Sequence, residues 1–408
     1  MESATSRNER RRLWGVLCLT SVVICIAWRW QTFHLSDFTR ASFGHLQYSD
    51  TVVFYYSRNL AAHQIPYVQQ QFEYPVLTGL AIWLSAWAPD ISGYFLVTSA
   101  LLLACFLGCF VLLARLGPAT RLSRYAAAPG LALYSVLNWD ALGLIALVAG
   151  IYFAHRRRFG WAGIILALGT SAKLFPAFIF PAILVYALRG RDLPDPRVER
   201  MSGRERLIEH MKPAARLVAG FAVVTLAANV PIALLNYDGW SHLLTFQSSR
   251  GINPDSIWFH LPRVSDHTVS VWFVELVLFV VIVTCMEVWL NRGTGWEAGC
   301  LLCLLAFLLF TRDYSPQYDL WLLPLLAILA CPLWLWLIFV VLDAAYYASI
   351  FWYYYLSFGG HLFFPVPDPA IMLGITVWGR EAALAMLAVW AFIRLRAARE
   401  SDRACASS

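Results

Sequence analysis

The residues best suited to chemistry stand at breaks between long apolar runs. The first break contains residues 47–75, QYSDTVVFYYSRNLAAHQIPYVQQQFEYP, whose only acids are Asp50 and Glu73. The residues around Asp50 are typical of a short amphipathic helix that lies on a membrane surface. A carboxylate there is either a general base made more basic by partial desolvation, or a surface charge or helix N-cap.

Glu73 and Tyr74 precede Pro75, which fits the first turn of a helix because its missing N–H is harmless there. Glu73 therefore either complements the positive end of that helix or contacts a substrate. Tyr74 either stacks on a sugar ring or anchors the chain at the membrane interface. The residues alone leave both pairs of alternatives open.

Polar residues also interrupt later apolar runs. Asn138 and Asp140 lie in YSVLNWDALG, and Lys173 lies in LGTSAKLFPAF. An ionisable residue at membrane depth is costly and is a functional-site candidate, although Asp140 could instead cap the next helix. Lys173 is too far from either end of its run to reach water easily, so it needs an anion. That anion is either a bound phosphate or an acid such as Asp140.

A further break, LLFTRDYSPQYDLWLLPLL, contains Arg312, Gln317 and Tyr318. The planar guanidinium of Arg312 suits a phosphate, and the alternatives are an ion pair with Asp313 or an interface anchor. Arg250, in FQSSRGINPDSIWFH, is a candidate of the same kind.

No metal site is predicted. The histidines, His361 among them, are scattered without the spacing of metal ligands. Cys300 and Cys303 form a lone CxxC inside an apolar run, where cysteine usually serves as a small packing residue. The sequence also has no P-loop, no GxGxxG and no HExxH motif.

The composition shows what kind of elements position these residues. The 408 residues are 60% hydrophobic and only 14% charged, against about 25% charged in a soluble domain. We therefore expect an all-α polytopic membrane protein that forms a single integral-membrane domain, 1–408. The expected spans are 13–33, 93–115, 126–138, 141–155, 160–172, 174–188, 217–236, 270–291, 296–311, 319–331, 333–356 and 374–395, with a further apolar stretch at 75–89.

Charge predicts the orientation. The basic segments are 7–12, 115–124, 156–158, 189–216 and 394–399, and the positive-inside rule places them and the N-terminus in the cytoplasm. The residues 34–74 then form a first external loop with juxtamembrane helices, 189–216 a basic cytoplasmic loop, and 396–408 a cytoplasmic tail. The residues singled out for chemistry fall on the external side. A net charge of +6 spread in this way indicates topology and not nucleic-acid binding.

Five strings in order are similar to one family: YSDTVVFYY, HQIPY…FEYPVLTG, NWDALGLIALVAGIYFA, RRRFGWAGIILALGTSAKLFPAF and SPQYDLWLLPLL. Together they resemble the integral-membrane glycosyltransferases of the type-C fold. The nearest match is glycosyltransferase family 87, the bacterial polyprenyl-phosphate-mannose-dependent α-mannosyltransferases. The resemblance implies a bundle of roughly 11–13 transmembrane helices.

The resemblance also implies roles for individual residues. Asp50 corresponds to the single essential acid of the first external loop and would be the general base. Asn138 and Asp140 correspond to a polar pair, and Lys173 to a lysine before a proline. The SPQY stretch contributes Ser315, Pro316, Gln317 and Tyr318, with Arg312 at a commonly basic position and Arg250 as a further phosphate ligand. Glu73, Tyr74 and His361 complete the expected substrate-binding set.

The implied activity is an inverting transfer of a sugar, most simply mannose, from a polyprenyl-phosphate donor to a glycolipid or glycan acceptor of the cell envelope. The reaction would take place at the external face of the plasma membrane. A single acid in YSDT favours a mechanism without a metal, and no cofactor is expected. A transporter or flippase of a lipid-linked sugar is the alternative, and such proteins have inverted repeats with broken helices.

Overall fold

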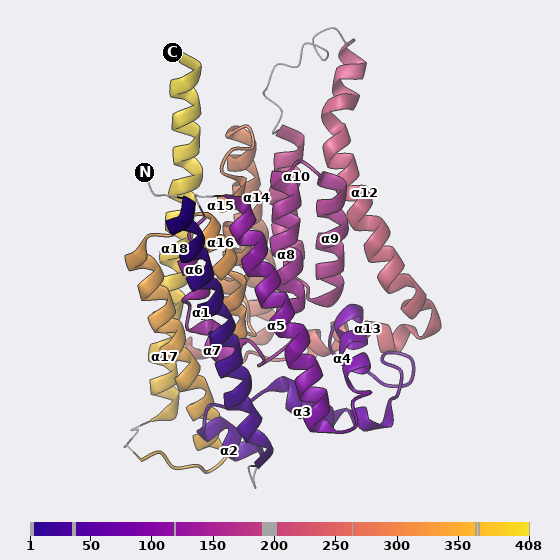
Figure 1. The fold of residues 1–408 in the computed structure, drawn as a ribbon, viewed down its shortest axis with the longest axis vertical. Helices are drawn as coiled ribbons and strands as arrows, with labels where there is room; N and C mark the ends of the chain where they lie inside the picture. The colour runs from indigo at the N-terminus through magenta and orange to yellow at the C-terminus, as the bar shows by residue number, and fades with distance from the viewer. Residues whose placement is uncertain are drawn as a thin grey trace.

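The computed structural model of this protein describes residues 4–34, 38–117, 120–189, 202–262, 264–363, 365 and 368–407. These residues form seventeen α-helices and several short 3-10 helices (Figure 1). Their one β-feature is an isolated bridge between Pro66 and Gln70. The all-α prediction is confirmed.

Six helices are long and apolar enough to cross a membrane. A membrane-spanning helix satisfies its backbone hydrogen bonds internally, which hydrocarbon requires. Of the roughly 11–13 spans expected, these six are long enough on their own, which supports the prediction of a polytopic membrane protein. They are α1 (Ala4–Trp30), α5 (Ile91–Leu116), α12 (Gly203–Leu235), α14 (Asp266–Leu290), α17 (Leu333–Ser357) and α18 (Pro369–Ser407).

Shorter apolar helices pack among the long ones. They are α4 (Val76–Ser85), α8 (Asp140–His155), α9 (Phe159–Ala172), α15 (Trp296–Phe310), and the 3-10 helix η3 (Phe175–Ile179) that continues into α10 (Phe180–Arg189). Each is shorter than the roughly 20 residues of a straight span. Two of their ends lie within the bundle, and a polar residue occurs at each: Asp140 begins α8, and Lys173 caps α9.

Two expected spans were wrong. Residues 126–138 are not one helix, because α6 (Ser123–Ala126) and α7 (Gly130–Tyr134) are separate, with Pro129 between them. Proline lacks the N–H that a continuous helix needs. Residues 319–331 likewise belong to the 3-10 helix η5 (Pro316–Trp321) and to α16 (Leu323–Ile328).

The expected basic loop 189–216 is partly helical. Its residues 190–201 lie outside the described part of the chain, and α12 begins directly after Ser202. Ser202 and Glu205 form a capping box, in which each side chain bonds to the other residue's backbone. The expected tail 396–408 also continues as helix α18 as far as Ser407.

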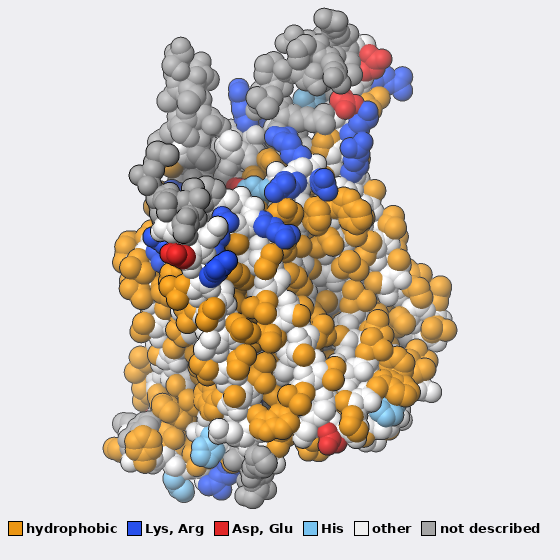
Figure 2. All heavy atoms as spheres, viewed as in Figure 1, with side chains coloured by type: hydrophobic (Ala, Val, Ile, Leu, Met, Phe, Trp, Pro, Cys, Tyr) orange, Lys and Arg blue, Asp and Glu red, His pale blue; other side chains and the backbone are white. Residues whose placement is uncertain are grey.

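Charge is distributed unevenly along the molecule. Lys and Arg side chains gather at the end where the chain terminates, and a hydrophobic belt lies below them (Figure 2). The first loop lies at the opposite end (Figure 1) and contains α2 (Phe38–Gly44) and α3 (Asp50–Ser57). Helix α13 (Tyr237–Ser249) lies near α4 at that same end. This distribution is the one on which the predicted orientation rests.

Candidate functional site

A cavity of about 740 Å³ lies between the first loop, η3, α13, α14 and the loop after α15. Most of the residues selected from the sequence line it, although they come from distant parts of the chain. They are Asp50, Glu73, Tyr74, Asn138, Lys173, Arg250, Arg312, Gln317 and Tyr318. Asp140 lies behind the wall and contacts Lys173.

Asp50 is the first residue of α3, directly after the N-cap Ser49. The Tyr48 hydroxyl donates to its Oδ1 at 2.9 Å, and Asn138 Nδ2 donates to its Oδ2 at 2.7 Å. Its own N–H is fixed to the Leu137 oxygen at 2.8 Å. The carboxylate therefore faces the cavity with both oxygens oriented, and the N-cap position belongs to Ser49.

Burial raises the pKa of the Asp50 carboxyl above its ordinary value. The hydrogen bonds from Tyr48 and Asn138 and the nearby charge of Lys173 oppose this rise in pKa without cancelling it. A carboxylate with a raised pKa is a stronger base than an exposed one. Asp50 thus has the chemistry of a proton acceptor.

Asn138 connects the acid to the cationic side of the cavity. Its Nδ2 also donates to the Tyr74 hydroxyl at 3.0 Å, and its Oδ1 accepts from Lys173 Nζ at 2.7 Å. The same Oδ1 accepts from the N–H of Trp139 at 2.6 Å, which fixes the amide orientation. A change at this amide would reach both Asp50 and Lys173.

Lys173 has the acid partner that the sequence offered as one alternative, and it also lines the cavity. Its Nζ lies 3.1 Å from Asp140 Oδ2, in an ion pair that Trp321 supports by donating to Asp140 Oδ1 at 2.8 Å. The same Nζ lies 4.7 Å from the centre of the Tyr74 ring and lines the cavity. The backbone of Lys173 is extended, and α9 ends directly before it at Ala172.

Arg312 and Arg250 lie on the opposite wall. Arg312 donates to the Ser270 hydroxyl at 2.8 Å and to the Gln247 oxygen at 2.7 Å, at the carboxyl end of α13. Arg250, and not Arg312, forms the ion pair with Asp313, at 2.5 Å. Among the ion pairs of the described residues none involves Arg312, so its charge is held by uncharged oxygens.

No protein-family model matches this chain, and no curated protein matches it.

Glu73 forms an ion pair with Arg58, the C-cap of α3, whose Nε donates to Glu73 Oε2 at 3.1 Å. Its carboxylate is therefore held by a guanidinium, and the N-cap of α4 is Pro75. The Tyr74 ring packs edge-on against Trp139, 5.1 Å between centroids. Both residues border the cavity beside Asp50.

His361 lies apart from the other selected residues. It lines a second cavity of about 590 Å³ that is bordered by Arg40, His45 and Tyr355. The structure therefore does not bring His361 together with Asp50. No group of three or more His, Cys, Asp or Glu residues that could hold a metal occurs in the described chain.

Three residues of the site were not selected from the sequence. Tyr48 orients Asp50 together with Asn138, which was selected; Trp321 orients Asp140, and Arg58 orients Glu73. Tyr48 stands two positions before Asp50, which was an available signal, whereas Arg58 is 15 positions from Glu73. Trp321 had none, because its partner is 181 positions away.

Proposed function

We propose that this protein is an inverting glycosyltransferase that moves a sugar from a polyprenyl-phosphate donor to an acceptor hydroxyl at the external membrane face. One observation carries the proposal. A desolvated, oriented carboxylate, Asp50, shares a cavity with Lys173, Arg250 and Arg312. Mannose is the sugar that the sequence resemblance favours.

In the proposed reaction Asp50 removes the proton of the acceptor hydroxyl as its oxygen attacks the anomeric carbon. The bond from that carbon to the phosphate oxygen breaks, and the phosphate leaves with the electron pair. General-base assistance of this kind contributes about 10²–10⁴-fold. Configuration inverts because attack and departure occur on opposite faces of the sugar.

The cations have different roles in this scheme. Arg312 carries a charge that no side-chain carboxylate in the described residues pairs with, so it is the best placed to bind the donor phosphate. Lys173 and Arg250 already have the partners Asp140 and Asp313. They add to the positive field, and such oriented cations in a low-dielectric site are worth several kcal/mol of transition-state stabilisation.

The apolar part of the cavity suits a prenyl chain. Phe178, Phe246, Phe273, Val274 and Phe307 line it, next to the outer helix α14. Helix α14 exposes large apolar residues to its surroundings, as a lipid-facing helix does. A donor could therefore reach the cavity from the bilayer.

A flippase of a lipid-linked sugar is the second candidate, because the 3-10 segments η3 and η5 interrupt apolar runs as broken helices do. One experiment separates the two functions. Purified protein in lipid vesicles is given a polyprenyl-phosphate sugar and an acceptor, and free polyprenyl phosphate is measured. Release that depends on the acceptor supports the transferase, whereas intact donor that changes leaflet supports the flippase.

A further inference from the structure

Two arginines are fully buried although neither lines the cavity. Arg29 lies in α1 and Arg380 in α18, and both have 0% exposed surface. A buried guanidinium is costly unless hydrogen bonds and aromatic faces satisfy it. Each arginine therefore depends on the partners that surround it, and those partners belong to the segments that carry the site.

Arg29 holds the segment that carries the acid. Its Nε donates to the Tyr48 oxygen at 3.2 Å, and its Nη2 donates to the Leu133 oxygen at 2.5 Å and to the Tyr347 hydroxyl at 3.0 Å. Tyr48 precedes Asp50 by two residues and donates its own hydroxyl to that carboxylate. One guanidinium thus joins α1, α7 and α17 to the start of α3.

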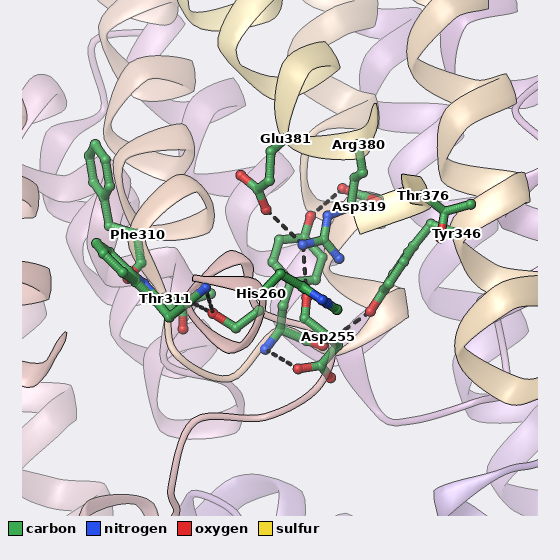
Figure 3. Close-up of polar contacts among 12 residues, drawn as sticks. Asp255, His260, Phe310, Thr311, Asp319, Tyr346, Thr376, Arg380 and Glu381 are labelled. Atoms are coloured by element: carbon green, nitrogen blue, oxygen red, sulfur yellow. Dashed lines mark hydrogen bonds and ion pairs between the residues drawn. The ribbon is translucent and has the colours of Figure 1, made fainter. Parts of the chain in front are cut away.

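Arg380 holds the opposite wall. Its Nη2 donates to the Asp255 backbone oxygen at 2.9 Å and to Glu381 Oε1 at 2.7 Å. Its guanidinium carbon lies 3.6 Å from the centre of the Tyr314 ring and 4.2 Å from that of Tyr346, in cation–π geometry. Figure 3 shows Arg380 directed from α18 toward the loop of Asp255.

Two hydrogen bonds join the segment held by Arg380, which includes Arg250, to the loop of Arg312. Asp255 Oδ1 accepts from the N–H of Tyr314 at 3.2 Å. Asn253 stands three positions after Arg250, and its N–H donates to the backbone oxygen of Arg312 at 3.0 Å. Residues 250–256 and 311–314 therefore form one unit, with Arg250 and Arg312 on its cavity side.

We propose that Arg29 and Arg380 are positioning residues, each for one half of the site. Arg29 holds the base Asp50, and Arg380 holds the phosphate-binding Arg250 and Arg312. The assignment of the two halves rests on the proposed function. At Arg29 the planar guanidinium bonds three oxygens through two nitrogens, and at Arg380 it lies against two aromatic faces while Nη2 bonds two oxygens. A lysine ammonium reproduces neither arrangement.

The test is the pair Arg29→Lys and Arg380→Lys. Both variants keep the charge, and each replaces one fully buried arginine. Each variant therefore controls for the loss of stability that such a replacement causes in the other. We expect Arg380→Lys to raise the donor KM and the Kd for polyprenyl phosphate, on the order of 10–100-fold. We expect Arg29→Lys to lower kcat by a similar factor while the Kd for polyprenyl phosphate stays unchanged. Equal losses of both parameters in both variants would overturn the proposal.

Amide hydrogen exchange without any ligand separates this proposal from the proposed function. Arg380→Lys should speed exchange at Asn253 and Tyr314 but not at Asp50, and Arg29→Lys should do the reverse. This pattern in a protein that transfers no sugar would refute the transferase and leave the positioning intact. The opposite result would refute the positioning alone: the wild type transfers sugar normally, but each variant speeds exchange equally at Asn253, Tyr314 and Asp50.

If a lysine variant fails to fold, milder variants keep the test open. Tyr347→Phe removes one acceptor from Arg29, and Glu381→Gln weakens one acceptor of Arg380. The same division between kcat and donor KM is expected at smaller size. Its absence in both milder variants would overturn the proposal.

Discussion

At the scale of single residues, the hydrogen bonds from Tyr48 and Asn138 modify the basicity of Asp50. Both donate to the carboxylate, and both hydrogen bonds hold its pKa below the value that burial alone would give. Because a general base acts only when ionised, the pH at which activity falls on the acid side follows this pKa. The hydrogen-bond partners of one side chain therefore become visible in a pH profile.

Tyr48→Phe removes the hydroxyl that stabilises the ionised form of Asp50. The pKa of Asp50 should rise further, so the acid limb of the kcat/KM profile should move to higher pH, with activity lost below it. The measurement is sugar transfer as a function of pH. Tyr55→Phe is the control, since Tyr55 packs against Tyr94 and does not line the cavity. An unmoved acid limb in Tyr48→Phe would contradict the role given to Asp50.

Single residues were predictable where a polar side chain interrupts an apolar run. Asn138, Asp140 and Lys173 were selected in this way, and the structure brings them into contact. Arg29 and Arg380 interrupt apolar runs in the same way, in CIAWRW and VWGREAAL, but they were not selected because they do not stand in loops. Which partner a buried charge meets depends on nonlocal packing, and no local pattern encodes that.

Helix ends are the important features at the scale of elements. Breaks at Asp140 and Lys173 were predicted because a polar residue stands between two apolar runs, and α8 and α9 do begin and end there. The prediction of one helix over 126–138 was wrong because it followed the hydropathy of the segment and did not allow for Pro129. Apolar content predicts burial, whereas continuity of a helix depends on backbone N–H groups.

Close packing of α9 on α12 depends on Gly163. A Cβ at this position would collide with the backbone oxygen of Leu217, which cannot move aside as a side chain can. Gly163→Ala should therefore force the helices apart and lower the free energy of unfolding by about 1–3 kcal/mol. Thermal unfolding in detergent is the measurement.

Gly160→Ala in the same helix is the matched control. A Cβ there would lie 3.9 Å from Arg216 Cβ, which is ordinary contact, so stability should not fall. Equal destabilisation of the two variants would show that the α9–α12 contact is not as close as described.

At the scale of the whole molecule, the orientation in the membrane decides on which face the cavity lies. Arg158 is exposed in the turn between α8 and α9, and Phe363 is 96% exposed in the loop between α17 and α18, at the opposite end (Figure 1). The positive-inside rule predicts that the Arg158 end faces the cytoplasm. Loop charges and hydropathy gave this orientation without any knowledge of packing.

Arg158→Cys and Phe363→Cys test the orientation in intact cells with a membrane-impermeant maleimide. We expect Phe363→Cys to react at once and Arg158→Cys to react only after permeabilisation. Cys405 is replaced by Ser in both variants, and the other eight native cysteines are buried or half-buried, so background labelling should be low. The reverse pattern would place the cavity on the cytoplasmic side.

The cavity itself could not be predicted from the sequence. Its walls come from residues as far apart as Tyr48 and Trp321, and the ion pair of Arg250 with Asp313 replaces the local pair expected for Arg312. Sequence patterns show which segments are apolar and where they end. Which loops then meet is decided by side-chain packing between helices that are distant in sequence.

Transfer of a lipid-linked sugar by Asp50→Asn tests the central claim most directly. Purified wild type, Asp50→Asn and the control Asp90→Asn are compared in lipid vesicles for release of polyprenyl phosphate in the presence of acceptor. Asp90 is an acid at the N-cap of α5, and asparagine caps a helix equally well. The account predicts a loss of about 10²–10⁴-fold in Asp50→Asn alone. Turnover by folded Asp50→Asn at the wild-type rate would contradict it.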